Sequence, residues 1–206
     1  CCLVIDPFGE SKAELQMSLV AFNPDLMAEV VLHSLNRHGY DSIGPITDYG
    51  LGTESMGSRP LIRDWEQTMV VEFAVTDEAD AAGLVPPNPL LDGRMPVIIE
   101  CEQILIEQVG ELVGINGGLA GPLSFASNLR GHETILLDMV VNPRLVHTLL
   151  EIALEASLSF GEAQIVHGGV KTVNIYEPLA TLISTPMAEE FSFHYLGQLI
   201  QGLKAL

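Results

Sequence analysis

The segment that most constrains the fold is a short apolar run that leads through paired glycines into a helix signal, at residues 113–131. Its start is typical of a buried strand, and Gly121-Pro122 begins the helix with proline at the first helical position. A strand that stops at Gly117-Gly118 before such a helix leaves backbone N–H groups unpaired and directed at one place. Two interpretations stay open: a ligand site at these N–H groups, or an ordinary turn between strand and helix.

Strand and helix signals alternate along the rest of the chain. Further strands are expected at residues 3–5, 42–47, 69–74 and 172–176, and helices at residues 24–39, 97–109, 133–140, 143–167 and 185–206. Four prolines in residues 85–96 exclude regular structure there. The alternation predicts parallel strands joined by right-handed crossovers, as in an open doubly wound sheet or a (β/α)₈ barrel.

Composition predicts one globular domain over residues 1–206, because 48% of the residues are hydrophobic and no low-complexity run occurs. The formal charge of -18, from 27 acidic and 9 basic residues, disfavours nucleic acid and anionic membranes as partners. No long uncharged apolar run and no basic leader are present, so a soluble protein without a signal peptide is expected. Three cysteines favour a reducing cytoplasm, and the first residue is not Met, so we expect translation to start upstream of it.

Three polar residues are expected at or just past the carboxyl ends of strands, where barrel enzymes assemble their sites: Asp48, Asn116 and Glu177. Glu54 adds a second carboxylate to the glycine-rich loop that begins at Asp48. The sequence therefore predicts that acidic and amide side chains, far apart along the chain, meet at one edge of a sheet.

Several segments resemble the uroporphyrinogen decarboxylase family, which also contains the methylcobamide:coenzyme M methyltransferases. They are RHGYDSIGPITDYGLGTESMG, GLAGPLSFASNLRG, NPRLVHTLLE and NIYEPLATLISTPMAEEFSFHYL, in the family's order from about Asn23 to the end. The resemblance implies a (β/α)₈ TIM barrel that is incomplete at the C-terminus, because a complete barrel needs about 250 residues. A fragment, completion by other chains and a natural truncation all stay open.

The resemblance leaves two chemistries in competition. Asp48 falls on the position of the aspartate with which the decarboxylases hold pyrrole N–H groups. The loop that corresponds to their arginine-rich N-terminal loop reads DPFGESK here and contains no arginine, and Asn128 replaces their tyrosine. A substrate with eight carboxylates needs concentrated positive charge, which 9 basic residues do not provide. The sequence of residues 177–181, from Glu177 to Thr181, resembles the pattern of the methyltransferases more than that of the decarboxylases. We therefore favour corrinoid-linked methyl transfer.

The methyltransferase resemblance implies methylcobalamin as methyl donor, bound to a corrinoid protein or free, and a thiol or similar small-molecule acceptor. Zinc held by a His-x-Cys pair and a later cysteine keeps that thiol ionised in the family. This sequence has no His-x-Cys, so no metal ligand is predicted in the chain. A homodimer is one expected assembly.

The roles that follow are hypotheses. Asp48 and Glu177 are the expected catalytic residues: Asp48 would orient a ligand N–H group or water, and Glu177 would position the acceptor. The expected substrate-binding residues are Glu54, Asn116, Gly117, Gly118 and Asn128. Decarboxylation of uroporphyrinogen in porphyrin biosynthesis is the first alternative, and a non-catalytic corrinoid-binding or accessory subunit is the second.

Overall fold

The computed structural model describes residues 16–64 and 68–206. The strand expected at residues 3–5 and the N-terminal loop at residues 6–12 lie outside this part of the chain.

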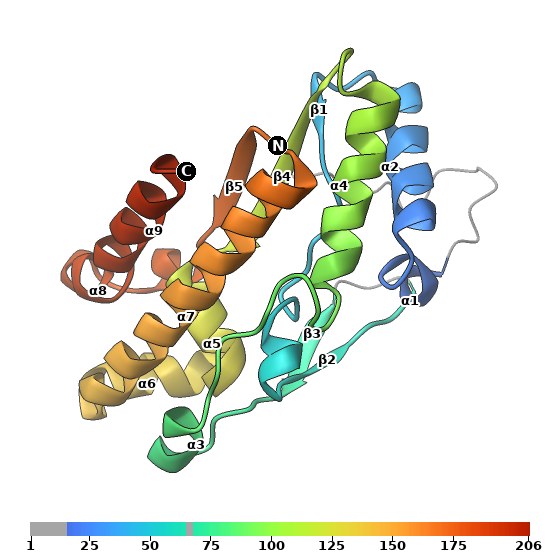
Figure 1. The fold of residues 1–206 in the computed structure, drawn as a ribbon. Helices are drawn as coiled ribbons and strands as arrows, with labels where there is room; N and C mark the ends of the chain where they lie inside the picture. Colours follow the sequence, from blue (N-terminus) through green and yellow to red (C-terminus); the bar gives the residue numbers. More distant parts are fainter. Residues whose placement is uncertain (1–15, 65–67) are drawn as a thin grey trace.

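A parallel sheet of three strands, in the order β1-β4-β5, organises the described residues (Figure 1). Its strands are β1 (Ser42–Ile43), β4 (Gly114–Ala120) and β5 (Thr172–Tyr176), and both pairings are parallel. Parallel neighbours need long crossover connections, which the helices between these strands supply. The predicted parallel arrangement is confirmed.

Helical segments account for most of the remaining chain. They are α1 (Met17–Val20), α2 (Pro24–His38), the 3₁₀ turn η1 (Thr53–Met56), α3 (Glu78–Ala82), α4 (Met95–Val109), α5 (Pro122–Arg130), α6 (His132–Val141), α7 (Pro143–Ala163), the π-helical turn η2 (Gln164–Gly168), the 3₁₀ turn η3 (Pro178–Leu182), α8 (Thr185–Ala188), the π-helical turn η4 (Glu189–Phe193) and α9 (His194–Lys204). The expected helix at residues 185–206 is thus α8, η4 and α9 in succession.

The predicted helix starts at Asn-Pro pairs are confirmed. The Asn23 side chain accepts a hydrogen bond from the Leu26 N–H at 3.0 Å, and the Asn142 side chain accepts one from the Leu145 N–H at 3.4 Å. Gly39 ends α2 with a φ of 65°, a conformation that glycine adopts without steric cost.

The strand expected at residues 42–47 is much shorter, because β1 ends at Ile43. Pro45 has no N–H group for a sheet ladder. A Cβ at Gly44 would lie 2.2 Å from the Asn116 carbonyl oxygen, so the chain passes too close to β4 for any larger residue. Residues 44–47 therefore leave the sheet as an irregular segment that leads to Asp48.

The prediction that the central strand stops at its paired glycines is wrong. β4 continues through Gly117 and Gly118, which pair with Val173 and Asn174 of β5, and ends at Ala120. Glycine is needed at position 117 because a Cβ there would lie 2.5 Å from the side-chain oxygen of Gln164. These glycines thus serve close packing within a strand.

An antiparallel pair, β2 (Arg59–Leu61) with β3 (Met69–Glu72), lies apart from the parallel sheet. The expected strand at residues 69–74 corresponds to β3, whereas β2 had no prediction. Its central residue is Pro60. The segment 59–61 therefore lacks the alternation and the β-branched residues that indicate a strand in the sequence.

The two faces of the parallel sheet have different surroundings. Leu119 belongs to a hydrophobic core that also contains Ile98 and Leu105 of α4, and the partly buried Ile175 packs against this core. Asn174 and Tyr176, which alternate with Ile175 along β5, line a cleft on the opposite face. An open doubly wound sheet would have helices on both faces, so this arrangement corresponds to a section of a (β/α)₈ barrel, as the resemblance implies.

Within residues 16–64 and 68–206, no helix combines the length and the apolar character needed to cross a bilayer.

Candidate functional site

A cleft of about 390 Å³ lies on the inner face of the parallel sheet, between the segment that follows β1 and the strands β4 and β5. Its polar lining residues are Ser42, Thr47, Asp48, Tyr49, Asn116, Ser157, Asn174 and Tyr176. Among the described residues that line it, none is lysine, arginine or histidine. The cleft therefore presents carboxylate, amide and hydroxyl groups to a ligand.

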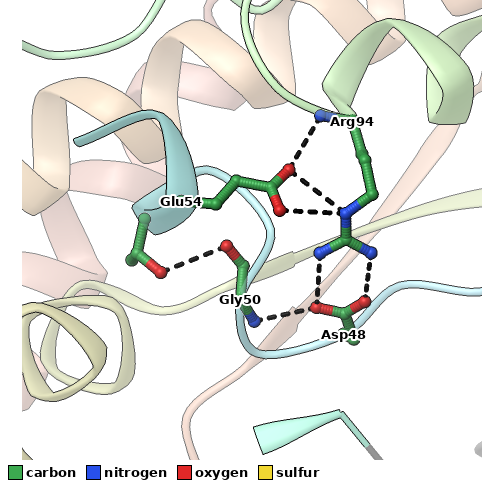
Figure 2. Close-up of polar contacts among 5 residues, drawn as sticks. Asp48, Gly50, Glu54 and Arg94 are labelled. Carbon is green, nitrogen blue, oxygen red and sulfur yellow. Dashed lines mark hydrogen bonds and ion pairs between the residues drawn. The ribbon is translucent and has the colours of Figure 1, made fainter. Parts of the chain in front are cut away.

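Asp48 lies at the cleft wall in a fixed orientation. Its Oδ1 accepts the Gly50 N–H at 2.8 Å, which is the local turn typical of aspartate, and also accepts Nη2 of Arg94 at 3.1 Å. Its Oδ2 accepts Nη1 of Arg94 at 2.5 Å, so guanidinium and carboxylate pair through two parallel bonds (Figure 2).

These contacts leave Asp48 one position for a ligand. Each carboxylate oxygen has two lone pairs, and within the described residues Oδ1 accepts two hydrogen bonds whereas Oδ2 accepts one. The side chain keeps 14% of its surface exposed. Asp48 can therefore accept one N–H or O–H group from a molecule in the cleft.

Glu54 does not line this cleft, contrary to its expected role in substrate binding. Its carboxylate oxygens accept Nε of Arg94 at 2.9 and 3.2 Å, and Oε1 also accepts the Arg94 backbone N–H at 2.8 Å. It borders a smaller hollow with Ser55, Pro86 and Asp92. A carboxylate with this many bonds to one arginine holds that arginine in place.

Asn116 lines the cleft but does not lie at the carboxyl end of its strand. It pairs with Thr172, the first residue of β5, and β4 continues to Ala120. Gly118 lies two residues further along the same face, where a Cβ would lie 3.2 Å from the Tyr176 ring and 3.5 Å from Thr47 Oγ1. The absence of a side chain at Gly118 keeps the floor of the cleft open.

The N–H groups of the glycines within β4 and directly after it are paired within the protein at Gly118 and Gly121. The Gly118 N–H donates to the Gln164 side chain at 2.8 Å, and the Gly121 N–H donates to the Tyr176 carbonyl at 2.8 Å. Of the two interpretations left open by the sequence, the structure favours an ordinary strand-to-helix turn.

Glu177 follows β5 directly, yet its side chain caps α5 and does not line the cleft. Its Oε2 accepts the Leu123 N–H at 3.0 Å, and its Oε1 accepts both the Ser124 N–H at 2.7 Å and the Ser124 hydroxyl. Burial raises the pKa of Glu177, and these three hydrogen bonds oppose that rise. The predicted meeting of Asp48, Asn116 and Glu177 is thus wrong for Glu177, whose carboxylate satisfies the N-terminus of a helix.

Asn128 is also outside the cleft. It lies in α5 with 2% of its surface exposed, and its side-chain amide donates to the Ser124 carbonyl at 2.9 Å. Its backbone carbonyl accepts the Ser58 hydroxyl at 2.9 Å. These contacts give Asn128 a structural position within the interior, and it is not among the described residues that line the cleft.

Three residues of the site were missed by sequence reasoning. Asn174 and Tyr176 alternate along β5 and so share its inner face, a signal that the strand pattern already contained. Arg94 is one of only 9 basic residues and directly precedes the Met95-Pro96 start of α4. Its position in a proline-rich connection gave no indication of its partners.

A fully buried carboxyl group lies behind the sheet. Glu102 of α4 is 0% exposed, and within the described residues neither of its carboxyl oxygens has a hydrogen-bond partner. Burial raises the pKa of Glu102 to about 9. Burial also raises the pKa of the adjacent Cys101 thiol to about 12, in line with the predicted packing role of that cysteine.

The pH dependence of folding tests the neutral state of Glu102. The unfolded carboxyl loses its proton near its ordinary pKa of 4.5, whereas the folded group keeps it to about 9. We expect the unfolding free energy to fall by up to about 1.4 kcal/mol per pH unit between these values. Urea unfolding from pH 5 to 9 measures this slope, and Glu102→Gln is expected to flatten it. An identical slope in the variant would show that Glu102 is ionised in the folded protein.

The described residues do not fit a zinc site. No group of three or more histidine, cysteine, aspartate or glutamate side chains in this part of the chain is arranged to hold a metal ion. Asp48, which lines the cleft, and Glu54 both pair with Arg94.

Comparison with known families gives a match to the family model described as uroporphyrinogen decarboxylase (URO-D) over residues 7–206. The chain belongs to the uroporphyrinogen decarboxylase family. This URO-D family chain is 26% identical over 192 residues to the methylcobamide:CoM methyltransferase MtaA of Methanosarcina barkeri, covering 89% of this chain and 55% of that protein. It is 25% identical over 191 residues to the uroporphyrinogen decarboxylase of Nitrosomonas europaea, covering 88% and 52%.

A solved methyltransferase from Methanosarcina mazei has a similar fold, with a TM-score of 0.83 and 26% sequence identity. The similarity covers 91% of the URO-D family chain and 56% of the methyltransferase. The chain thus has the fold of a partial URO-D α/β barrel and spans about half the length of the curated relatives it matches. Its relatives are enzymes of both kinds, so identity alone does not separate methyl transfer from decarboxylation.

Proposed function

We propose that the protein transfers a methyl group from a corrinoid, with methylcobalamin as donor, to a small thiol or similar acceptor. The observation that carries this proposal is the chemistry of the cleft lining: among its described residues are one carboxylate, amides and hydroxyls, but no basic side chain. The relatives named as methylcobamide:CoM methyltransferases add support for this choice within the family.

The cleft is a poor environment for uroporphyrinogen. A ligand with eight carboxylates needs several arginine or lysine side chains, and unpaired anions would be repelled by Asp48. Arg94, which lies behind Asp48, already pairs with both Asp48 and Glu54. Two carboxylates around one guanidinium give this cluster a formal charge of -1, so it attracts no further anion.

The proposed roles of the cleft residues follow from their contacts. Asp48 accepts one N–H or O–H group of the ligand through Oδ2 and fixes its orientation. Asn116 and Asn174 offer amide donors and acceptors on neighbouring strands, and Gly118 between them lets a ligand approach the backbone. The chain's own contribution is then to bind and orient, which lowers the entropic part of the barrier for a two-substrate reaction.

An assay with both donor and acceptor tests the proposal. The full-length protein is incubated with methylcobalamin and a small thiol, and the loss of methylcobalamin absorbance is followed together with the thioether product by mass spectrometry. We expect thioether in proportion to the methylcobalamin consumed. Incubation with uroporphyrinogen gives the comparison, and release of carbon dioxide with coproporphyrinogen, without thioether formation, would assign decarboxylation instead.

A further inference from the structure

We propose that Arg94 is the positioning residue of the site: it holds Asp48 in its ligand-accepting orientation and is itself held by Glu54 (Figure 2). This inference rests on the proposed role of Asp48 in methyl transfer. It gives Glu54 a function different from substrate binding, and it adds Arg94, which does not line the cleft, to the site.

The contacts of Arg94 determine both the place and the direction of the Asp48 carboxylate. Nη1 and Nη2 each bond a different oxygen of Asp48, at 2.5 and 3.1 Å, so the two planar groups lie edge to edge. A single bond would leave the carboxylate free to rotate, whereas paired bonds fix its plane. The remaining acceptor position of Oδ2 therefore has one direction relative to the cleft.

Arg94 is fixed in turn at three points. Glu54 accepts its backbone N–H and its Nε, and the Phe22 ring lies 5.6 Å from the guanidinium carbon, within the range of a cation–π contact. Gly93 precedes it with a φ of 57°, and a Cβ there would lie 2.5 Å from the Ser55 hydroxyl. The conformation of the loop before α4 thus holds Arg94 against Glu54 and Asp48.

The charges of the cluster depend on each other. Arg94 is 4% exposed, and burial alone would lower its pKa, but the hydrogen bonds and charges of Asp48 and Glu54 outweigh burial and raise it. Without the guanidinium, two carboxylates would face each other in a largely buried place and would repel. A lysine at position 94 could not replace Arg94, because one ammonium group cannot pair with both oxygens of Asp48 and also reach Glu54.

A double-mutant cycle on methyl transfer separates positioning from general support of the fold. Arg94→Met is expected to lower the rate about 30-fold, and Asp48→Asn about 100-fold. If Arg94 acts through Asp48, the double variant stays near the Asp48→Asn rate, about 100-fold below the parent. Independent effects would multiply to about 3,000-fold and would overturn the inference.

Three further variants distinguish positioning by Arg94 from loss of folding. Glu54→Gln leaves the Arg94–Asp48 pair in place and is expected to lower the rate about fivefold, an effect that should vanish in the Asp48→Asn background. Added methylguanidinium should raise the rate of Arg94→Ala but not that of Asp48→Asn. The control Arg59→Met removes an exposed pair with Glu72 and should change neither rate nor coupling.

The orientation of the Asp48 carboxylate in crystal structures tests the inference independently of the proposed reaction. Crystal structures of the parent protein and of Arg94→Met show whether the Asp48 carboxylate keeps its direction, whatever reaction the protein catalyses. A rotated carboxylate supports positioning by Arg94 even if no methyl transfer is found. An unchanged carboxylate overturns it even if methyl transfer is confirmed.

Discussion

The Glu177→Ala variant is expected to lose about 3 kcal/mol of unfolding free energy. The change removes the acceptor of three hydrogen bonds and leaves the N–H groups of Leu123 and Ser124 unpaired in a buried place. Each unsatisfied buried group costs about 1–3 kcal/mol, and the removal of a side-chain cap is expensive for the same reason. Guanidinium or thermal unfolding followed by circular dichroism measures the loss.

The control for this prediction is Glu189→Ala, which removes an exposed carboxylate from η4 and is expected to change stability by less than about 0.5 kcal/mol. The comparison also decides between two roles of Glu177. If Glu177→Ala kept the parent's stability but lost methyl transfer, the carboxylate would be catalytic, as the sequence suggested, and its assignment as a helix cap would be wrong.

The second large effect is expected for Asp48→Asn, which should lower the rate of methyl transfer about 100-fold while the protein stays folded. Asparagine has nearly the same shape, but its NH₂ group would face the guanidinium of Arg94, and the ligand would lose a charged acceptor. A hydrogen bond to a charged group is worth about 1.5–3 kcal/mol, which corresponds to roughly 10-fold to 150-fold in rate.

Steady-state rates with methylcobalamin and thiol measure this loss, and Asp77→Asn is the matched control. Asp77 is an exposed N-cap of α3 that does not line the cleft, so its change should leave the rate within about twofold. Equal rates for Asp48→Asn and the parent would remove Asp48 from the site.

Local signals in the sequence predicted the helices well. The Asn-Pro pairs at residues 23–24 and 142–143 begin α2 and α7, because cap and helix are only three residues apart and need no tertiary partner. The order of strands and helices also predicted the parallel sheet. The ends of strands were predicted less well, since Gly117 and Gly118 indicate a stop by composition but are placed inside β4 by the packing of Gln164 and Tyr176.

The site was predicted less completely than the helices, because it is held by contacts between residues far apart in the sequence. Arg94 lies 46 residues from Asp48 and 40 from Glu54, so no spacing rule connects them. Glu177 was placed correctly after β5, but the partner of its carboxylate is 53 residues away in α5. The end of β5 predicted where Glu177 lies, and only the tertiary structure showed that its carboxylate points to α5.

The most direct test of the account is a crystal structure of the full-length protein with the thiol acceptor and a methylcobalamin analogue bound. We expect a ligand on the inner face of the β1-β4-β5 sheet, with an N–H or O–H donor within about 3 Å of Asp48 Oδ2. Ligand density elsewhere, with Asp48 contacting only Arg94 and Gly50, would contradict it.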